Sequence, residues 1–320
     1  MPILGILPLL LGLNPDPLLM PKQIEAWVRD FAPIVVHDSR ELAPLTSIKA
    51  QLALEPELQG SCADGSRRGI KVRDENFMQQ ADVQQLLRDC GQETAMHFGR
   101  SIPKPENISY YSVVADGLYL KIQYWLYYAW NDTSLLGGGP AVQQCGGHEG
   151  DWEHVALRLN RQKLVQATSQ AEAFAAIDDI YLAGHGRRAH LEYKRFRRGD
   201  RQLHFEANHL LVYPGVGSHA SYAAPGRYHL MTLAGMPIAD LNDGKGLRME
   251  LAQGRLEPVV SQPWFDYPGR WGAIQHDACD SVEALSSASN DGSYGPGHAH
   301  KVVELYQGDW QDDLRPLASH

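Results

Sequence analysis

The feature that most constrains the fold is an aromatic and β-branched run over residues 110–131, YYSVVADGLYLKIQYWLYYAWN. Its side chains nearly alternate between two faces, and residues of this kind favour pleated, half-buried strands. The segment DWEHVALRL, residues 151–159, alternates in the same way and places Asp151 and Glu153 on one face and Trp152 on the other. Together they predict paired β-strands.

The remaining patterns extend this β-rich interpretation. Further strands are predicted from DDIYLAGH, AHLEYKRF, QLHFEA and HLLVYPG, and APIVVHDSRELAPL predicts a short buried strand that runs into a polar turn. Helices are predicted over 17–31, 82–90 and 169–177, whereas residues 48–75 and the Gly- and Pro-rich last third predict loops. We therefore predict one mainly β domain over residues 1–320, a single β-sandwich with helical decorations and long loops, whose core strands over 107–222 carry the site.

The composition of the 320 residues is that of an ordinary globular protein, with 43% hydrophobic and 21% charged residues. A net charge of −9 argues against a general nucleic-acid binder, whose surface is usually basic, so no nucleic-acid partner is expected. A basic run over residues 187–201 interrupts this acidic average. It is either a solvated hairpin or a patch for an anionic substrate or lipid headgroup, and Arg187 and Arg188 are its candidate substrate-binding residues.

Two features bear on the compartment of the protein. The four cysteines, at positions 62, 90, 145 and 279, include no CxxC pair, so a structural zinc site is not expected, and disulfides and reduced thiols both stay open. The N-terminal apolar and helical segment, residues 1–31, is apolar for thirteen residues but has no Lys or Arg before Lys22. It is a poor signal peptide and too short to span a bilayer, so we expect it to pack on the fold. We expect no transmembrane segment and favour a cytoplasmic protein over a secreted one.

A dense group of ionisable residues, GGHEGDWE, directly precedes the strand that begins near residue 151. On a strand, Asp151 and Glu153 would place their Cβ atoms about 6–7 Å apart. Two unpaired carboxylates at that distance repel each other, and a divalent cation, a shared proton or a basic partner could relieve the repulsion. His148 can reach the same face, and one imidazole with two carboxylates is a common ligand set for divalent cations, with carboxylates favouring harder ions. The spacing alone leaves a metal site, an acid–base site and structural salt bridging open.

Nearby glycines and histidines add detail to this candidate site. Gly146, Gly147 and Gly150 would allow the backbone to approach an ion or a substrate closely. His219, in the turn VGSHASY, and His185, in LAGHGRR, are candidates for proton transfer beside Glu153. Ser218 is a candidate substrate contact. A Ser218–His219 nucleophile pair is not expected, because the side chains of adjacent residues on an extended backbone diverge.

The motifs together resemble a known family. FAPIVVHDSRELAPL, YWLYYAWN, GGHEGDWEHVALRL, VYPGVGSHASYAAPG, GRWG and YGPG occur in the order found in the vacuolar protein sorting-associated protein 62 family, between about residues 31 and 297. GHEGDWE, residues 147–153, is also similar to the heptapeptide Gly-His-Arg-His-Asp-Trp-Glu of the necrosis- and ethylene-inducing peptide-like cytotoxins, which have a β-sandwich fold.

The toxin resemblance implies roles for particular residues. It implies that His148, Asp151 and Glu153 surround a divalent cation, with Asp132 as a further ligand, and Gly150 stands where the toxins have their second histidine. We expect one divalent cation, Mg, Ca or Mn rather than Zn.

Three functions from different classes follow from these residues. The first is a divalent-metal-dependent enzyme, a hydrolase or a lyase or cyclase, acting on a small anionic substrate. The second is a metal-assisted protein that binds a lipid headgroup or a glycan, as the toxin resemblance implies. The third is a structural or partner-binding protein whose charges only brace the sandwich. The sequence places the enzyme first and does not indicate an oligomeric state.

Overall fold

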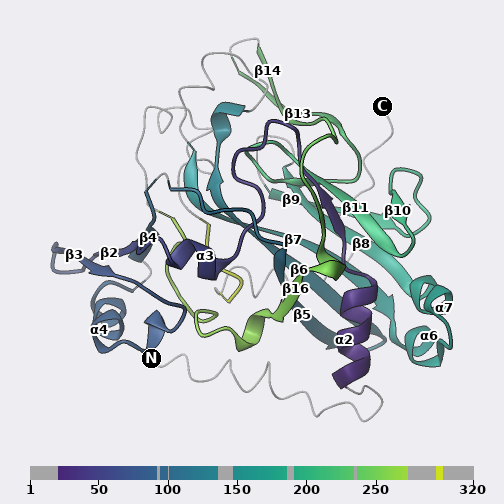
Figure 1. The fold of residues 1–320 in the computed structure, drawn as a ribbon, viewed down its shortest axis with the longest axis horizontal. Helices are drawn as coiled ribbons and strands as arrows, with labels where there is room; N and C mark the ends of the chain where they lie inside the picture. The colour runs from purple at the N-terminus through teal and green to yellow at the C-terminus, as the bar shows by residue number, and fades with distance from the viewer. Residues whose placement is uncertain are drawn as a thin grey trace.

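The computed structural model describes residues 21–91, 94–99, 101–135, 147–185, 191–233, 236–272 and 293–297, and Figure 1 shows their arrangement. A six-stranded sheet runs through the middle of the molecule. Its strands are, in spatial order, β16 (Arg255–Pro258), β5 (Ile108–Asp116), β6 (Tyr119–Asn131), β7 (His148–Asn160), β8 (Ile177–His185) and β9 (Leu191–Arg197). β16 pairs with β5 in parallel, and the other neighbours are antiparallel. The strands predicted from the aromatic run and from DWEHVALRL are therefore the centre of the fold.

A second sheet packs on one face of the six-stranded sheet. It contains β10 (Phe205–Glu206), β11 (His209–Pro214), β1 (Ile34–Val36) and β15 (Arg248–Glu250), and β12 (Ser221–Tyr222) pairs with β11. One core cluster joins the two sheets, with Val155 and Leu157 of β7 packed in the same cluster as Val35 and Val212. Two packed sheets around a shared apolar core make a β-sandwich, so the predicted mainly β fold is confirmed.

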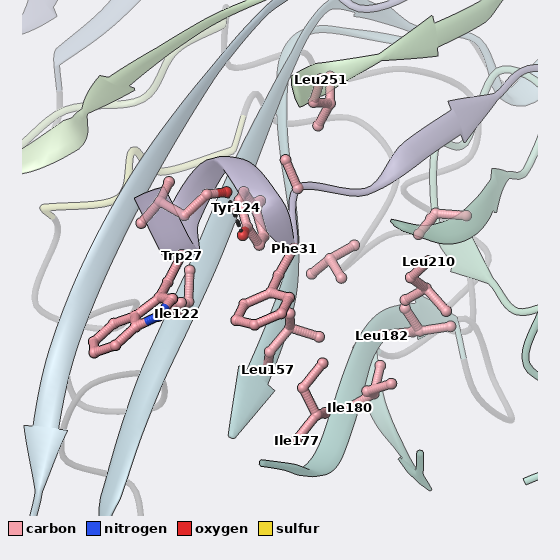
Figure 2. Packing of buried hydrophobic residues seen from close by; sticks show 14 of the residues in the cluster. Trp27, Phe31, Ile122, Tyr124, Leu157, Ile177, Ile180, Leu182, Leu210 and Leu251 are labelled. Carbon is pink, nitrogen blue, oxygen red and sulfur yellow. Dashed lines mark hydrogen bonds between the residues drawn. The ribbon is translucent and has the colours of Figure 1, made fainter. Parts of the chain in front are cut away.

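Helix α2 (Pro21–Asp30) closes this core at one end. Its apolar side chains lie on one face, and Figure 2 shows Trp27 and the following Phe31 beside Ile122 and Leu157 of the central strands. Pro21 begins the helix, a position where the missing N–H costs nothing. The hydroxyl of Tyr124 donates to the carbonyl of Val28 at 2.8 Å, which ties the helix to β6. Each fully buried aromatic side chain of this kind stabilises the fold by about 1.5–3 kcal/mol.

The opposite face of the six-stranded sheet carries a second core. A small sheet of β3 (Arg67–Lys71), β2 (Glu57–Ser61) and β4 (Thr94–His97) covers it together with α3 (Ile48–Leu52) and α4 (Ala81–Cys90). Trp152 of β7 lies in this core with Trp125, Trp264 and Trp271. The loop prediction for residues 48–75 is therefore wrong: the segment contains α3 and a β-hairpin. Its strands are mostly exposed and polar, so they lack the apolar alternation by which a strand is recognised.

The other elements are short or lie at the periphery. They are α6 (Arg161–Gln166), α7 (Gln170–Ala175), β13 (Gly226–Leu233), β14 (Met236–Asn242) and the 3₁₀ turns η1 (Phe77–Gln79), η3 (Thr133–Leu135), η5 (Leu251–Gln253) and η6 (Val259–Ser261). No helix within the described ranges is long and apolar enough to cross a bilayer. Predictions about residues 1–20, Cys145, Cys279, Arg187 and Arg188 fall outside the described residues.

A disulfide between Cys62 and Cys90 joins the end of β2 to the end of α4, across a sequence separation of 28. We expect the double variant Cys62→Ser/Cys90→Ser to lose about 2–4 kcal/mol of unfolding free energy, because the unfolded chain regains the freedom that the cross-link removes. Urea unfolding of both proteins would measure the loss. An unchanged midpoint in the double variant would show that the cross-link contributes no stability.

Candidate functional site

The candidate site is built on β6 and β7, which pair along their whole length. Tyr128 lies opposite Asp151, and Leu126 lies opposite Glu153. Beyond Glu153 the same face of β7 carries residues of the first core, while Trp152 points into the second core. The predicted alternation is thus present, and it places both carboxylates at the edge of the sandwich core.

The alternation breaks at Gly150, which has a φ of +61°. Regular alternation would put Glu149 on the face of Asp151 and His148 on the other. Instead, the Glu149 carboxylate accepts a hydrogen bond from the backbone N–H of Phe98 at 2.9 Å, on the side of β4. His148 lies near enough to Asp151 for its charge to lower the pKa of that carboxyl group. The left-handed glycine therefore interrupts the alternation just before Asp151 and directs Glu149 towards β4.

Gly147 and Gly150 each lie against the main chain of another segment, and Gly146 falls outside the described residues. A Cβ atom on Gly150 would lie 1.4 Å from the carbonyl oxygen of Trp271, and one on Gly147 would lie 1.6 Å from the carbonyl oxygen of Asn131. Each position therefore excludes every other residue by a clash with the main chain.

The centre of the site is His219, which is fully buried between two carboxylates. Its Nδ1 lies 3.1 Å from Oδ2 of Asp151, and its Nε2 lies 3.5 Å from Oε2 of Glu41. Its ring stacks on Tyr128, with the centroids 3.8 Å apart and an angle of 3° between the planes. Because both ring nitrogens face carboxylates, the geometry suits the doubly protonated imidazolium.

The pKa shifts agree with this charge state. Burial lowers the pKa of His219, but the charge of Glu41 and the hydrogen bond with Asp151 outweigh it and raise the value to about 10. Burial raises the pKa of Asp151 and of Glu41, but their interactions with His219 bring each value down to about 2. At neutral pH the group thus carries two carboxylates around one cation. The protein itself supplies a basic partner for Asp151.

Two members of this group were missed by the sequence analysis. Glu41 follows β1 in a stretch that predicted only a polar turn, and its Oε2 also accepts a hydrogen bond from the N–H of Gly217 at 2.8 Å. Asn131, the last residue of β6, donates from Nδ2 to Oδ2 of Asp151 at 3.0 Å. The available signal was the polar cluster HDSRE directly after a buried strand, but nothing in the sequence connects it to residue 151.

The other predicted residues have varied positions. Ser218 is buried beside His219, and its hydroxyl has no hydrogen-bond partner within the described part of the chain. Asp132 uses Oδ1 to accept hydrogen bonds from the N–H and the hydroxyl of Ser134, at 3.0 and 2.6 Å, so it caps the turn after β6. His185 ends β8 opposite Leu191.

The imidazole and carboxylate donors near β7 are of types that suit a hard divalent cation. Among the described residues, no three His, Cys, Asp or Glu side chains are grouped so as to hold a metal ion. One oxygen of Asp151 already accepts hydrogen bonds from His219 and Asn131. The cation stays a prediction, and we derive no step that passes through it.

The comparisons with known proteins fit the sequence motifs. No family model matches the chain. Vacuolar protein sorting-associated protein 62 of Saccharomyces cerevisiae is 27% identical over 177 residues, which are 48% of this chain and 34% of that protein. The chain thus spans about a third of the length of this relative. The resemblance to that protein is confirmed.

Solved structures of the toxin group are also similar to this chain. Necrosis and Ethylene inducing Protein 2, from the causal agent of cocoa's Witches Broom disease, is 11% identical with a TM-score of 0.39, covering 89% of this chain and 91% of that one. The non-toxic HaNLP3 protein is 14% identical with a TM-score of 0.40, covering 93% and 94%. NLPPya in complex with glucosamine is 12% identical with a TM-score of 0.33, covering 72% and 78%.

Proposed function

We propose that this protein binds a hydroxyl-rich polar ligand, a glycan or a lipid headgroup, at the acidic group formed by Glu41, Asp151 and Glu153. The observation that carries the proposal is a pair of buried hydroxyl groups, one on Tyr128, which stacks on His219, and one on Ser218, which precedes His219 in the chain. Within the described ranges, neither the hydroxyl of Tyr128 nor that of Ser218 has a hydrogen-bond partner. Tyr128 lies opposite Asp151 on the neighbouring strand and stacks on His219, and burial, together with the charges of the three carboxylates, raises its pKa well above its ordinary value.

The chemistry of this group matches a sugar hydroxyl better than a purely anionic ligand. Buried polar groups are nearly always paired with protein, water or ligand atoms, so the two hydroxyls indicate a polar occupant. A sugar hydroxyl both donates and accepts, and it can satisfy a carboxylate and a protein hydroxyl at once. An anion placed directly against three carboxylates would be repelled. Arg187 and Arg188, the predicted anion contacts, lie outside the described residues.

Binding is favoured over the enzyme that the sequence placed first. An efficient general base has a pKa near the working pH. His219, the main candidate for proton transfer, is held as an imidazolium between Asp151 and Glu41. Both of its ring nitrogens are then protonated, so it cannot accept a proton as a general base at neutral pH. Its contacts are those of a fixed counter-ion, which positions carboxylates for a ligand.

The disulfide bears on the compartment. Cys62 and Cys90 are paired, and disulfides persist mainly in oxidising compartments. We propose, in place of the cytoplasmic preference from the sequence, a secreted or lumenal protein in which this cross-link stays formed.

Titration calorimetry on the full chain would test the proposed function. The probes are glucosamine and mannosamine, which two of the similar solved structures hold, with glucose for comparison. We expect saturable binding of at least one probe, and we expect Asp151→Asn to weaken it tenfold or more, about 1.4 kcal/mol. Glu172→Gln, on the exposed helix α7, is the matched control and should bind as the wild type does. A folded wild-type protein that binds no probe with or without Mg²⁺, Ca²⁺ or Mn²⁺ would contradict the proposal.

The same samples test the predicted cation. Metal analysis of protein purified without chelator should find about one equivalent, and Asp151→Asn should lose it. Retention of the metal by that variant would rule out Asp151 as a ligand. Binding that survives EDTA would show that the ligand needs no metal.

A further inference from the structure

The loop after β1 and the turn before β12 meet at a single side chain, Glu41. The carboxylate is buried, with 4% of the side chain exposed. Its Oε1 accepts a hydrogen bond from the N–H of Ala43 at 2.8 Å, within its own loop. Its Oε2 accepts from the N–H of Gly217 at 2.8 Å and faces Nε2 of His219. Glu41 therefore fixes the turn that carries His219 against the loop that follows β1.

His219 needs such an external contact, because its own backbone is in an unfavourable conformation. Its φ is +56°, a left-handed value that non-glycine residues adopt only when the surroundings impose it. Its N–H donates to the carbonyl of Gly215 at 2.8 Å, which holds the main chain of the turn. That bond does not set the direction of the imidazole ring.

The ring direction is set by contacts in two different planes. Stacking on Tyr128 fixes the plane of the imidazole, but the ring could be flipped by half a turn about the Cβ–Cγ bond and still stack, with its nitrogens and carbons exchanged. The contacts at the two ring nitrogens, Asp151 at Nδ1 and Glu41 at Nε2, select one of these two orientations. Without the Glu41 carboxylate, only the contact with Asp151 would select between them.

From this geometry we infer that Glu41 is a positioning residue of the ligand site: it holds His219, and through His219 it holds the carboxylate of Asp151 in the binding orientation. The inference rests on the proposed function. The distance of 3.5 Å between Glu41 and Nε2 is long for a hydrogen bond, so the attraction is mainly between charges. A glutamine at this position has one acceptor oxygen, so one of the two backbone donors, Ala43 or Gly217, loses its partner, and Nε2 of His219 no longer faces a carboxylate.

The test compares Glu41→Gln with a matched variant, Glu106→Gln. Glu106 is a half-buried glutamate that accepts a hydrogen bond from the Ser47 hydroxyl, outside the site. We expect Glu41→Gln to weaken glucosamine binding tenfold or more, and Glu106→Gln to change it less than twofold. A Glu41→Gln protein that binds as tightly as the wild type would overturn the inference.

A second measurement needs no ligand. In nuclear magnetic resonance spectra of the wild type, the Nδ1 proton of His219 should be shifted downfield and exchange slowly with water, because Asp151 accepts it in the interior. Glu41→Gln should lose this signal and Glu106→Gln should keep it. Retention of the signal in Glu41→Gln would show that Glu41 only stabilises the fold. A wild type that binds no probe would refute the proposed function, while the signal would still decide whether Glu41 orients His219.

Discussion

Replacing His219 by glutamine should remove about 3–5 kcal/mol of unfolding free energy. The imidazolium is the counter-ion of two buried carboxylates, Asp151 and Glu41, and removing one partner of a buried ion pair leaves uncompensated charge in the interior. The variant also loses the stacking contact with Tyr128. Urea unfolding at pH 7 would measure the effect.

The matched control is His209→Gln. His209 is half-buried, and its Nδ1 lies 2.8 Å from the carbonyl of Ala32, a neutral partner. Its replacement should cost about 1 kcal/mol, the worth of a single hydrogen bond. Equal losses in the two variants would contradict the role of His219 as a buried counter-ion.

The contribution of His219 and its two carboxylate partners to the unfolding free energy should depend on pH in a defined direction. The folded pKa of His219, about 10, lies above its ordinary value of 6.5. Its contribution is therefore complete below pH 6.5 and is lost as the pH rises towards 10. The difference in unfolding free energy between the wild type and His219→Gln should therefore decrease as the pH rises from 6.5 to 10. Asp151 and Glu41, with pKa values lowered to about 2, contribute above their ordinary pKa range and lose their contribution as the pH falls to 2.

Gly150→Ala should be the most damaging small substitution in the site. A left-handed φ costs a non-glycine residue about 1–2 kcal/mol. The new methyl group would also meet the Trp271 carbonyl oxygen at 1.4 Å, and overpacking of this kind costs about 1–3 kcal/mol more. The backbone must shift to relieve the clash, and Gly150 directly precedes Asp151, so both the unfolding free energy and the ligand affinity should fall.

Gly117→Ala separates the two causes. Gly117 has a similar φ of +55°, but a Cβ atom there would have no neighbour within 4 Å. Gly117→Ala should lose only the cost of a left-handed φ, about 1–2 kcal/mol of unfolding free energy, and should bind the ligand as the wild type does. If Gly150→Ala and Gly117→Ala had equal unfolding free energies and equal affinities, close approach at Gly150 would have no consequence for the site.

The sequence analysis succeeded where the signal is local. Aromatic and β-branched alternation identified β5, β6 and β7, because each strand has one or two faces buried along its length. Alternation also assigned Asp151 and Glu153 to one face correctly. It failed at β2 and β3, where most side chains are exposed and carry no apolar period.

The contacts of the site were beyond local patterns. Glu41 and Asp151 are 110 positions apart and are linked through His219. The turn that carries His219 lies beside the Glu41 loop because β1 and β11 pair in the second sheet, which no short motif encodes. The reversal of alternation at Gly150 depends on the close approach of Trp271, from a distant loop. His219 was identified as a candidate from its turn, but its role as a counter-ion depends on Glu41, which was missed.

The position of Asp151 in β7 has a practical consequence for finding the ligand. The strand supplies Val155 and Leu157 to one core and Trp152 to the other, so it cannot detach without both cores opening. A molecule that binds only the folded site must then raise the melting temperature of the whole sandwich, by an amount that grows with its concentration above Kd. A thermal-shift screen of soluble glycans and headgroups can therefore identify the ligand without any assay of activity.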